Sequence, residues 1–202
     1  MNEHGLRIVV DPRWVVAVPG NDVVAEVARQ FGTDDADAND QSIEVARTSS
    51  SVLQTAIDDG VWWAGVLAIG EGDEVVIVRA TLDWSGPAEE PISAQDIFDV
   101  VSVEGRDADQ IVEIELIQSQ LGEAVRHRQV LIYSDGNVGD YLGFSCPYDG
   151  GVLAMRVFST VSGWASVFSP MIEAMFLSIR SDTDVPPGVV QMVSFELAGE
   201  SL

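Results

Sequence analysis

The stretch DGGVLAMRVFSTVSGWASVFSPMIEAMFLSIR, residues Asp149–Arg180, decides the fold of this chain. A glycine turn leads into a strand-like run, and that run leads into a long apolar segment. In this segment the large residues recur every three or four positions, which places them on one face of a helix: Trp164, Val167, Phe168, Met171, Ile172, Met175 and Ile179. We therefore expect a helix over Gly163–Ile179 that packs across the sheet to which its own strand belongs.

The segments before this helix have the patterns of antiparallel strands. In Gln110–Ile117, Glu113 and Glu115 fall on one face while Ile114 and Leu116 fall on the other, which is typical of a strand with one face in water. β-branched or alternating runs between turn residues predict these strands: Leu6–Val10, Trp14–Val18, Val61–Ile69, Glu74–Asp83, Gln110–Ile117, Glu123–Tyr133, Tyr141–Cys146, Gly151–Ser159 and Val189–Leu197. Helical spacing predicts further helices in Val23–Phe31, Gln41–Asp58 and Ser93–Val101. The pattern predicts an α+β fold, with an antiparallel sheet of about six to eight strands and helices packed across it.

The C-terminal region carries its own signal. We expect residues 1–185 to form a single α+β domain and residues 186–202 to form a C-terminal extension. Pro186-Pro187-Gly188 separates the two, and the apolar residues after it alternate with polar ones at the strand period. We therefore expect Val189–Leu197 to be an added strand. It can pair with its own sheet or with a second copy of the chain, so a homodimer remains open.

The charge of the chain limits its partners. The sequence has 33 acidic residues against 10 basic ones, all of them Arg, for a formal net charge of −23. Binding to phosphate groups needs clustered Lys and Arg, so the composition disfavours nucleic acid and anionic membrane surfaces as partners. A basic protein partner is compatible with this charge.

Hydropathy and cysteine content favour a soluble protein. Hydrophobic residues make up 47% of the 202 residues, enough for a sizeable core. The single Cys146 excludes an intrachain disulfide framework. The N-terminal sequence lacks the pattern of a signal peptide, and no apolar run reaches the ~20 residues that span a bilayer. We therefore expect a cytoplasmic protein with no membrane insertion.

The second half of the chain resembles a known group of proteins. The order is LGEAVR at Leu121–Arg126, YLGF at Tyr141–Phe144, LAMRVFST at Leu153–Thr160, and then the closing helix up to Arg180. This order resembles the PsbP-like and LpqN-like group, over Leu121–Arg180, and actinobacterial members of that group are often acidic and poor in Lys. The group includes photosystem and mycobacterial lipoproteins, a nuclear-transport regulator and chaperones for bacterial toxins. This chain departs from the lipoproteins because no leader or anchoring cysteine stands near its start.

The resemblance implies a function as well as a fold. The fold would be a PsbP-like sandwich, an antiparallel sheet with helices across it. The function would be that of a non-catalytic, chaperone-like actinobacterial protein that acts through protein contacts, with a link to a secretion system allowed. The group has no common catalytic residue to transfer to this sequence. A structural subunit that is active only as an oligomer stays open as an alternative.

The best catalytic candidate in the sequence is Cys146 with His127 and Asp135, which would make the chain a small hydrolase. A cysteine nucleophile needs a base within hydrogen-bond reach and a group that orients that base. Cys146 lies at the end of an apolar strand, where a cysteine behaves as a small hydrophobic residue. We therefore expect packing and no catalysis from this thiol, and His127 on the solvent side of its strand.

Cofactor and metal sites are not expected either. The chain lacks the clustered Cys and His of zinc sites and the glycine motifs of nucleotide sites. The acidic run Thr33–Asp40 has Asp40 where a calcium loop needs Gly, counting from Asp35 as the first ligand. We interpret this run as a solvated linker.

Trp62 and Trp63 are the candidate contacts for a partner. Adjacent strand residues point to opposite faces of a sheet, so the two indoles cannot share one core. If helices cover both faces of the sheet, both indoles are buried. If one face is open, one indole is exposed and can anchor a partner.

Overall fold

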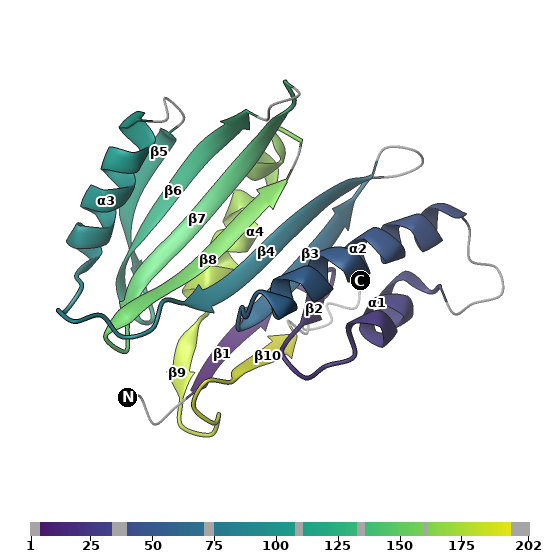
Figure 1. Ribbon diagram of the computed structural model, residues 1–202, viewed down its shortest axis with the longest axis horizontal. Helices are drawn as coiled ribbons and strands as arrows, with labels where there is room; N and C mark the ends of the chain where they lie inside the picture. The colour runs from purple at the N-terminus through teal and green to yellow at the C-terminus, as the bar shows by residue number, and fades with distance from the viewer. Residues whose placement is uncertain are drawn as a thin grey trace, which may run out of the picture.

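The computed structural model describes residues 5–33, 40–70, 75–107, 111–132, 136–159 and 161–194 (Figure 1). The strands in these residues are β1 Gly5–Val10, β2 Val15–Ala17, β3 Trp63–Ile69, β4 Val76–Trp84, β5 Ile111–Ser119, β6 Gly122–Ile132, β7 Val138–Tyr148, β8 Gly151–Ser159, β9 Arg180–Asp182 and β10 Val190–Ser194. The helices are α1 Val23–Phe31, α2 Asp40–Asp58, α3 Ala94–Asp107 and α4 Trp164–Leu177. The predicted α+β class is confirmed.

Seven of the strands form one antiparallel sheet in the order β2-β3-β4-β8-β7-β6-β5. Hairpins join β3 to β4, β5 to β6, β6 to β7 and β7 to β8, as the alternating runs predict. At the last hairpin, Asp149 and Gly150 both have positive φ, 46° and 75°, which is a conformation that Gly and Asp accept more readily than other residues.

The remaining strands form a second, smaller sheet that the sequence does not predict. Its order is β10-β1-β9, with β10 parallel and β9 antiparallel to β1. The predicted strand over Val189–Leu197 is therefore present as β10, and it pairs with β1 of its own chain; the part of the prediction beyond residue 194 lies outside the described residues. Ser181 and Asp182 pair with β1 as part of β9, a strand of three residues that is too short for a strand period to show in the sequence.

Alternation along β3 shows that both faces of the large sheet are covered. Trp63 and Leu67 belong to a core shared with α4 and the small sheet, while Ala64 and Val66 belong to a core shared with α1 and α2. In Figure 1, α2 and α3 lie in front of the large sheet, and α4 lies behind it. The expectation that the helix after β8 crosses one face of the sheet is confirmed, and helices on the opposite face add a third layer.

Polar contacts from neighbouring strands fix both ends of α4. Gly163, which precedes the helix, has no side chain to cap it, and the buried carboxylate of Asp140 on β7 accepts hydrogen bonds from Gly163 N at 2.7 Å and Ala165 N at 3.4 Å instead. At the other end, Ser178 Oγ accepts a hydrogen bond from Val9 N of β1 at 2.9 Å. These contacts set the rotation of α4 and therefore decide which of its side chains face outward.

Candidate functional site

The outer side of α4 is apolar and faces solvent. Glu173 is the only charged residue of this helix. Its inner side is buried in the core through Ile172, Phe176 and their neighbours. On the outer side, Val167 is 69% exposed, and Pro170 and Ala174 are also exposed. A helix that is hydrophobic all round is normally covered on all sides, so the outer side of this helix is an uncovered apolar surface.

This exposure corrects one part of the sequence analysis. The three- and four-residue spacing places Val167 on the inner face, but the structure has it in solvent. The spacing does not predict the inner face correctly because the helix carries apolar residues on all of its sides, so the sequence pattern defines no unique inner face. Phe168 lies at the edge of the core, partly buried, and Phe176, absent from the predicted face, is 1% exposed.

An apolar pocket of about 500 Å³ lies on one side of α4. Its walls are Val9 and Pro12 from the small sheet side and Met171 and Met175 from the helix. A volume of this order is typical of pockets that bury a small ligand or a large side chain. Methionine side chains are flexible and polarizable, so they adapt to occupants of different shapes.

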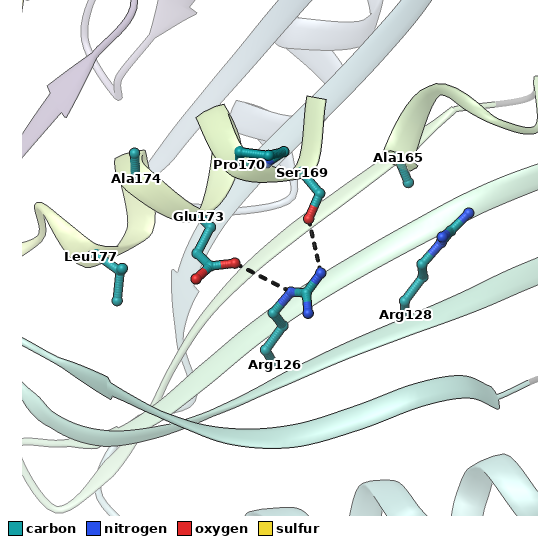
Figure 2. Close-up of a pocket in the computed structure, with 8 residues that line it drawn as sticks. All are labelled: Arg126, Arg128, Ala165, Ser169, Pro170, Glu173, Ala174 and Leu177. Carbon is teal, nitrogen blue, oxygen red and sulfur yellow. Dashed lines mark hydrogen bonds and ion pairs between the residues drawn. The ribbon is translucent and has the colours of Figure 1, made fainter. Parts of the chain in front are cut away.

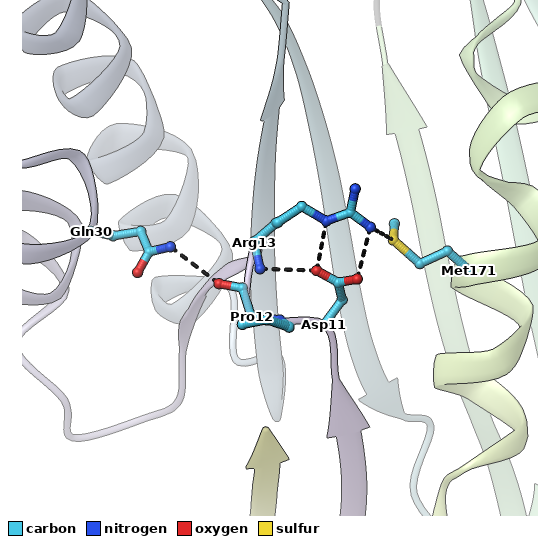
Figure 3. Close-up of polar contacts among 5 residues, drawn as sticks. All are labelled: Asp11, Pro12, Arg13, Gln30 and Met171. Atoms are coloured by element: carbon cyan, nitrogen blue, oxygen red, sulfur yellow. Dashed lines mark hydrogen bonds and ion pairs between the residues drawn. The ribbon is translucent and has the colours of Figure 1, made fainter. Parts of the chain in front are cut away.

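An ion pair closes the rim of this apolar pocket. Asp11 accepts hydrogen bonds from Arg13 Nε and Nη2, each at 2.8 Å, and Arg13 Nη2 also lies 3.1 Å from Met171 Sδ (Figure 3). The hydrogen bond from Arg13 lowers the pKa of Asp11, so the pair is ionised at neutral pH. Gln30 on α1 donates to the carbonyl of Pro12 at 3.1 Å and holds the turn in place. The rim is thus built from side chains that also tie α1 and α4 to the β1–β2 turn.

A polar pocket of about 480 Å³ lies on the other side of α4, over β6. Figure 2 shows Arg126 rising from β6 between Ser169 and Glu173 of the helix. Its Nη2 donates to Ser169 Oγ at 2.9 Å, and its Nε lies 3.5 Å from a carboxylate oxygen of Glu173. Its Nη1 meets Glu115 and Glu113 of β5. Arg128, the second cation of this pocket, lies 3.6 Å from the Asp140 carboxylate that caps α4.

Ala174 belongs to both pockets. It is exposed and has only a methyl side chain, so the two pockets are neighbours across a low point on the helix. A segment that crosses α4 at Ala174 can therefore contact both pockets together. The exposed outer side of α4, defined by Val167, Pro170 and Ala174, and the two flanking pockets form one surface, which we call the α4 surface.

The catalytic candidates do not come together. His127 pairs with Gly143 in the sheet, whereas Cys146 stands three residues further along β7 and therefore points to the opposite face. Cys146 is fully buried in the core below α4, and burial raises the pKa of its thiol to about 12. Asp135 lies outside the described residues. Among the residues that the structure describes, no histidine therefore lies on the side of the sheet that holds the thiol, so none can act there as the base of a cysteine nucleophile.

His127 itself is placed differently from the expectation. It is 7% exposed instead of facing solvent, and its ring lies 5.2 Å from that of Tyr141. Burial, followed by the charge of Arg156, lowers the pKa of His127 to about 4. Its neutral ring lies directly over Gly143, where a Cβ atom would come within 2.2 Å of His127 Cε1. We interpret His127 as a packed and uncharged residue at neutral pH.

The two tryptophans proposed as partner contacts have different surroundings. Trp63 is fully buried, 6.5 Å from the ring of Trp14, and its Nε1 donates to Met192 Sδ at 3.1 Å. Trp62 is partly buried and lies 5.6 Å from the ring of Trp84. Of the pair, only Trp62 has surface that a partner can reach in this structure. Its contact with a partner stays a prediction.

Comparison of the sequence with protein-family models and with curated proteins finds no match. The resemblance to the PsbP-like and LpqN-like group therefore rests on the quoted sequence order. None of the helices among the described residues combines the length and the hydropathy that a bilayer crossing requires. Within the same residues, no group of three or more His, Cys, Asp or Glu side chains is arranged to hold a metal ion.

Sequence reasoning missed the α4 surface. It treated the whole helix as core and did not connect it with Asp11–Arg13 or with Arg126. One signal was present: Pro170 stands in the interior of the helix, where it removes a backbone hydrogen bond and costs about 3 kcal/mol. A residue that weakens a helix in its interior could have drawn attention to this side of α4.

Proposed function

We propose that this chain is a non-catalytic, chaperone-like binding protein whose α4 surface contacts a partner protein. One observation carries the proposal: a helix with a single charge exposes apolar residues between two pockets that share Ala174. Exposed apolar surface next to a concave pocket is characteristic of interaction sites. The exposed Val167 and the methionines of the apolar pocket would supply the contact area, and the charged residues beyond them would form a polar rim.

The surroundings of Cys146 support binding over hydrolysis. A nucleophilic cysteine reacts as the thiolate, and a buried thiol with a pKa of about 12 is protonated at neutral pH. The only histidine among the described residues lies on the other face of the sheet. The α4 surface is therefore a better candidate for binding a partner protein than Cys146 is for attacking a substrate.

The experiment compares partner capture by the tagged wild-type chain and three variants in the native cell. Val167→Glu places a charge on the α4 surface. Val24→Glu is the matched control, because Val24 is also an exposed valine on a helix, 64% exposed against 69% for Val167. We expect Val167→Glu to reduce the captured partner at least about tenfold, as blocking a central interface contact does, and Val24→Glu to leave it unchanged.

The third variant tests the hydrolase alternative. We expect Cys146→Ser to capture the same partner in the same amount as the wild type. Capture that is equal for Val167→Glu and the wild type contradicts the binding site. Loss of function in Cys146→Ser with an unchanged circular dichroism spectrum contradicts the non-catalytic assignment and favours the hydrolase.

A further inference from the structure

We infer that the occupant of the α4 surface is a basic amphipathic helix of a partner protein. This inference rests on the proposed function and adds the chemistry of the partner. An apolar side chain of the partner helix enters the pocket bounded by Met171 and Met175. A Lys or Arg on the flank of the same helix reaches the carboxylates around Arg126.

The apolar pocket defines the anchor of the partner. Its walls of Val9, Pro12, Met171 and Met175 present almost no hydrogen-bonding groups. The polar side chains that line it are already engaged: Asp11 and Arg13 with each other, and the Ser178 hydroxyl with Val9 N and the Met175 carbonyl. A leucine, methionine or phenylalanine side chain can fill such a pocket without leaving a polar group unpaired. Apolar anchors at helical spacing in a methionine-lined groove are a common mode of peptide recognition.

The polar pocket defines the charge of the partner. Arg126 has five N–H donors. Its Nη1 and Nη2 donate hydrogen bonds to Glu113, Glu115 and Ser169, and its Nε forms an ion pair with Glu173 at 3.5 Å without a hydrogen bond. Its side chain is 14% exposed, whereas those of Glu113, Glu115 and Glu173 are 49%, 45% and 33% exposed. An approaching group therefore meets the carboxylates first. Arg126 and Arg128 face four carboxylates when Asp140 is included, so this region is net negative and favours a cation.

The shape of α4 between the pockets suits a crossing helix. Packed helices approach to about 8–10 Å between axes, and close approach needs small residues at the crossing point. Ala174 is the exposed residue that lines both pockets, and its methyl group leaves room for such an approach. A helix that crosses here places residues on its two flanks over the two pockets.

Charge distinguishes a basic partner from the other occupants. A second copy of this chain carries the same formal net charge of −23, so the two copies repel each other. Nucleic acid and anionic lipid carry the same sign of charge as the carboxylates around Arg126 and are repelled by them. A basic amphipathic helix matches both features of the surface, the apolar pocket and the exposed carboxylates.

The test uses three labelled synthetic peptides of about 18 residues, or five helical turns. The first is an amphipathic Leu/Lys helix, the second has Glu in place of Lys, and the third contains the residues of the first in an order without an apolar face. Binding is measured by fluorescence anisotropy over a range of salt concentrations. We expect the amphipathic lysine peptide to bind most tightly to the wild-type chain.

Two pairs of variants locate the binding. Ala174→Trp blocks the crossing point and should weaken binding of the lysine peptide at least about tenfold, whereas the control Val24→Trp should not change it. Glu173→Gln should weaken binding about two- to fivefold at low salt, the effect of one exposed ion pair, and much less at high salt. Glu44→Gln is its control, because Glu44 is also a helical glutamate paired with an arginine, Arg47. Thermal melting confirms that the variants are folded.

Each result supports or overturns the inference. It is overturned if the Glu peptide or the scrambled peptide binds as tightly as the lysine peptide, or if Ala174→Trp and Val24→Trp behave alike. If Val167→Glu and Ala174→Trp lose the native partner while the lysine peptide shows no preference, the proposed function stands and the basic helix is wrong. If these variants retain the native partner, the proposed function itself fails.

Discussion

Replacement of Phe176 by alanine tests whether the inner side of α4 holds the fold together. Phe176 is 1% exposed, and its ring stacks on that of Phe144 in β7 with centroids 5.0 Å apart and planes at 21°. Truncating a buried phenylalanine costs about 3–5 kcal/mol, and an aromatic pair accounts for about 0.5–1.5 kcal/mol of such a loss. We expect Phe176→Ala to lower the free energy of unfolding by about 4 kcal/mol. Total stabilities are about 5–15 kcal/mol, so this is a large fraction.

Phe168→Ala is the matched comparison, because both residues are phenylalanines of the same helix. Phe168 is only partly buried, so its truncation should cost less than about 3 kcal/mol. The assay is urea denaturation followed by circular dichroism, with the midpoint compared at an unchanged slope. The helical spacing of the sequence places Phe168 at the centre of the core, whereas the structure assigns that place to Phe176. An equal or larger loss for Phe168→Ala would refute the rotation of α4 described here.

Two further predictions concern the sheets. Because burial lowers the pKa of His127 to about 4, the unfolded chain binds this proton before the folded chain does as the pH falls below 6.5, and the folded state loses stability between pH 6.5 and about 4. Denaturation midpoints should show that the wild type loses about 2 kcal/mol more of its unfolding free energy than His127→Gln between about pH 7 and pH 5. Equal losses in the two proteins would contradict a buried neutral His127. Truncation after Asp184 removes β10, which pairs with β1 and contacts Trp63 through Met192. We expect the melting temperature to fall while light scattering shows the same oligomeric state as the wild type. A change of oligomeric state would instead indicate strand exchange between two copies.

The elements that local patterns define could be predicted from the sequence. The strand–helix order of Asp149–Arg180 appears in the structure as β8 followed by α4. The alternation over Gln110–Ile117 appears as β5. In these segments the apolar period, the turn residues and the helix ends all indicate the same structure, which makes sequence patterns reliable.

Features that depend on long-range register could not be predicted. The small sheet joins β1 to β10, and the partner of Leu6 is Val190, so no local pattern reveals the pairing. Gly143 is required because His127 lies over it, and this relation exists only in the register of β6 with β7. The α4 surface depends in the same way on the position of Asp140, whose carboxylate caps a helix that begins more than twenty residues later.

The two sides of α4 can therefore change separately. Its inner side packs against the sheet through residues such as Ile172 and Phe176, and its N-terminus is capped by Asp140, so its position does not depend on the outer residues. Pro170 on the outer side costs helix stability that these inner contacts offset. Substitutions of Val167 or Ala174 should thus alter binding without unfolding the chain, because exposed positions away from the core usually change stability by less than about 0.5 kcal/mol. This separation allows loss of binding in these variants to be assigned to the α4 surface and not to a damaged fold.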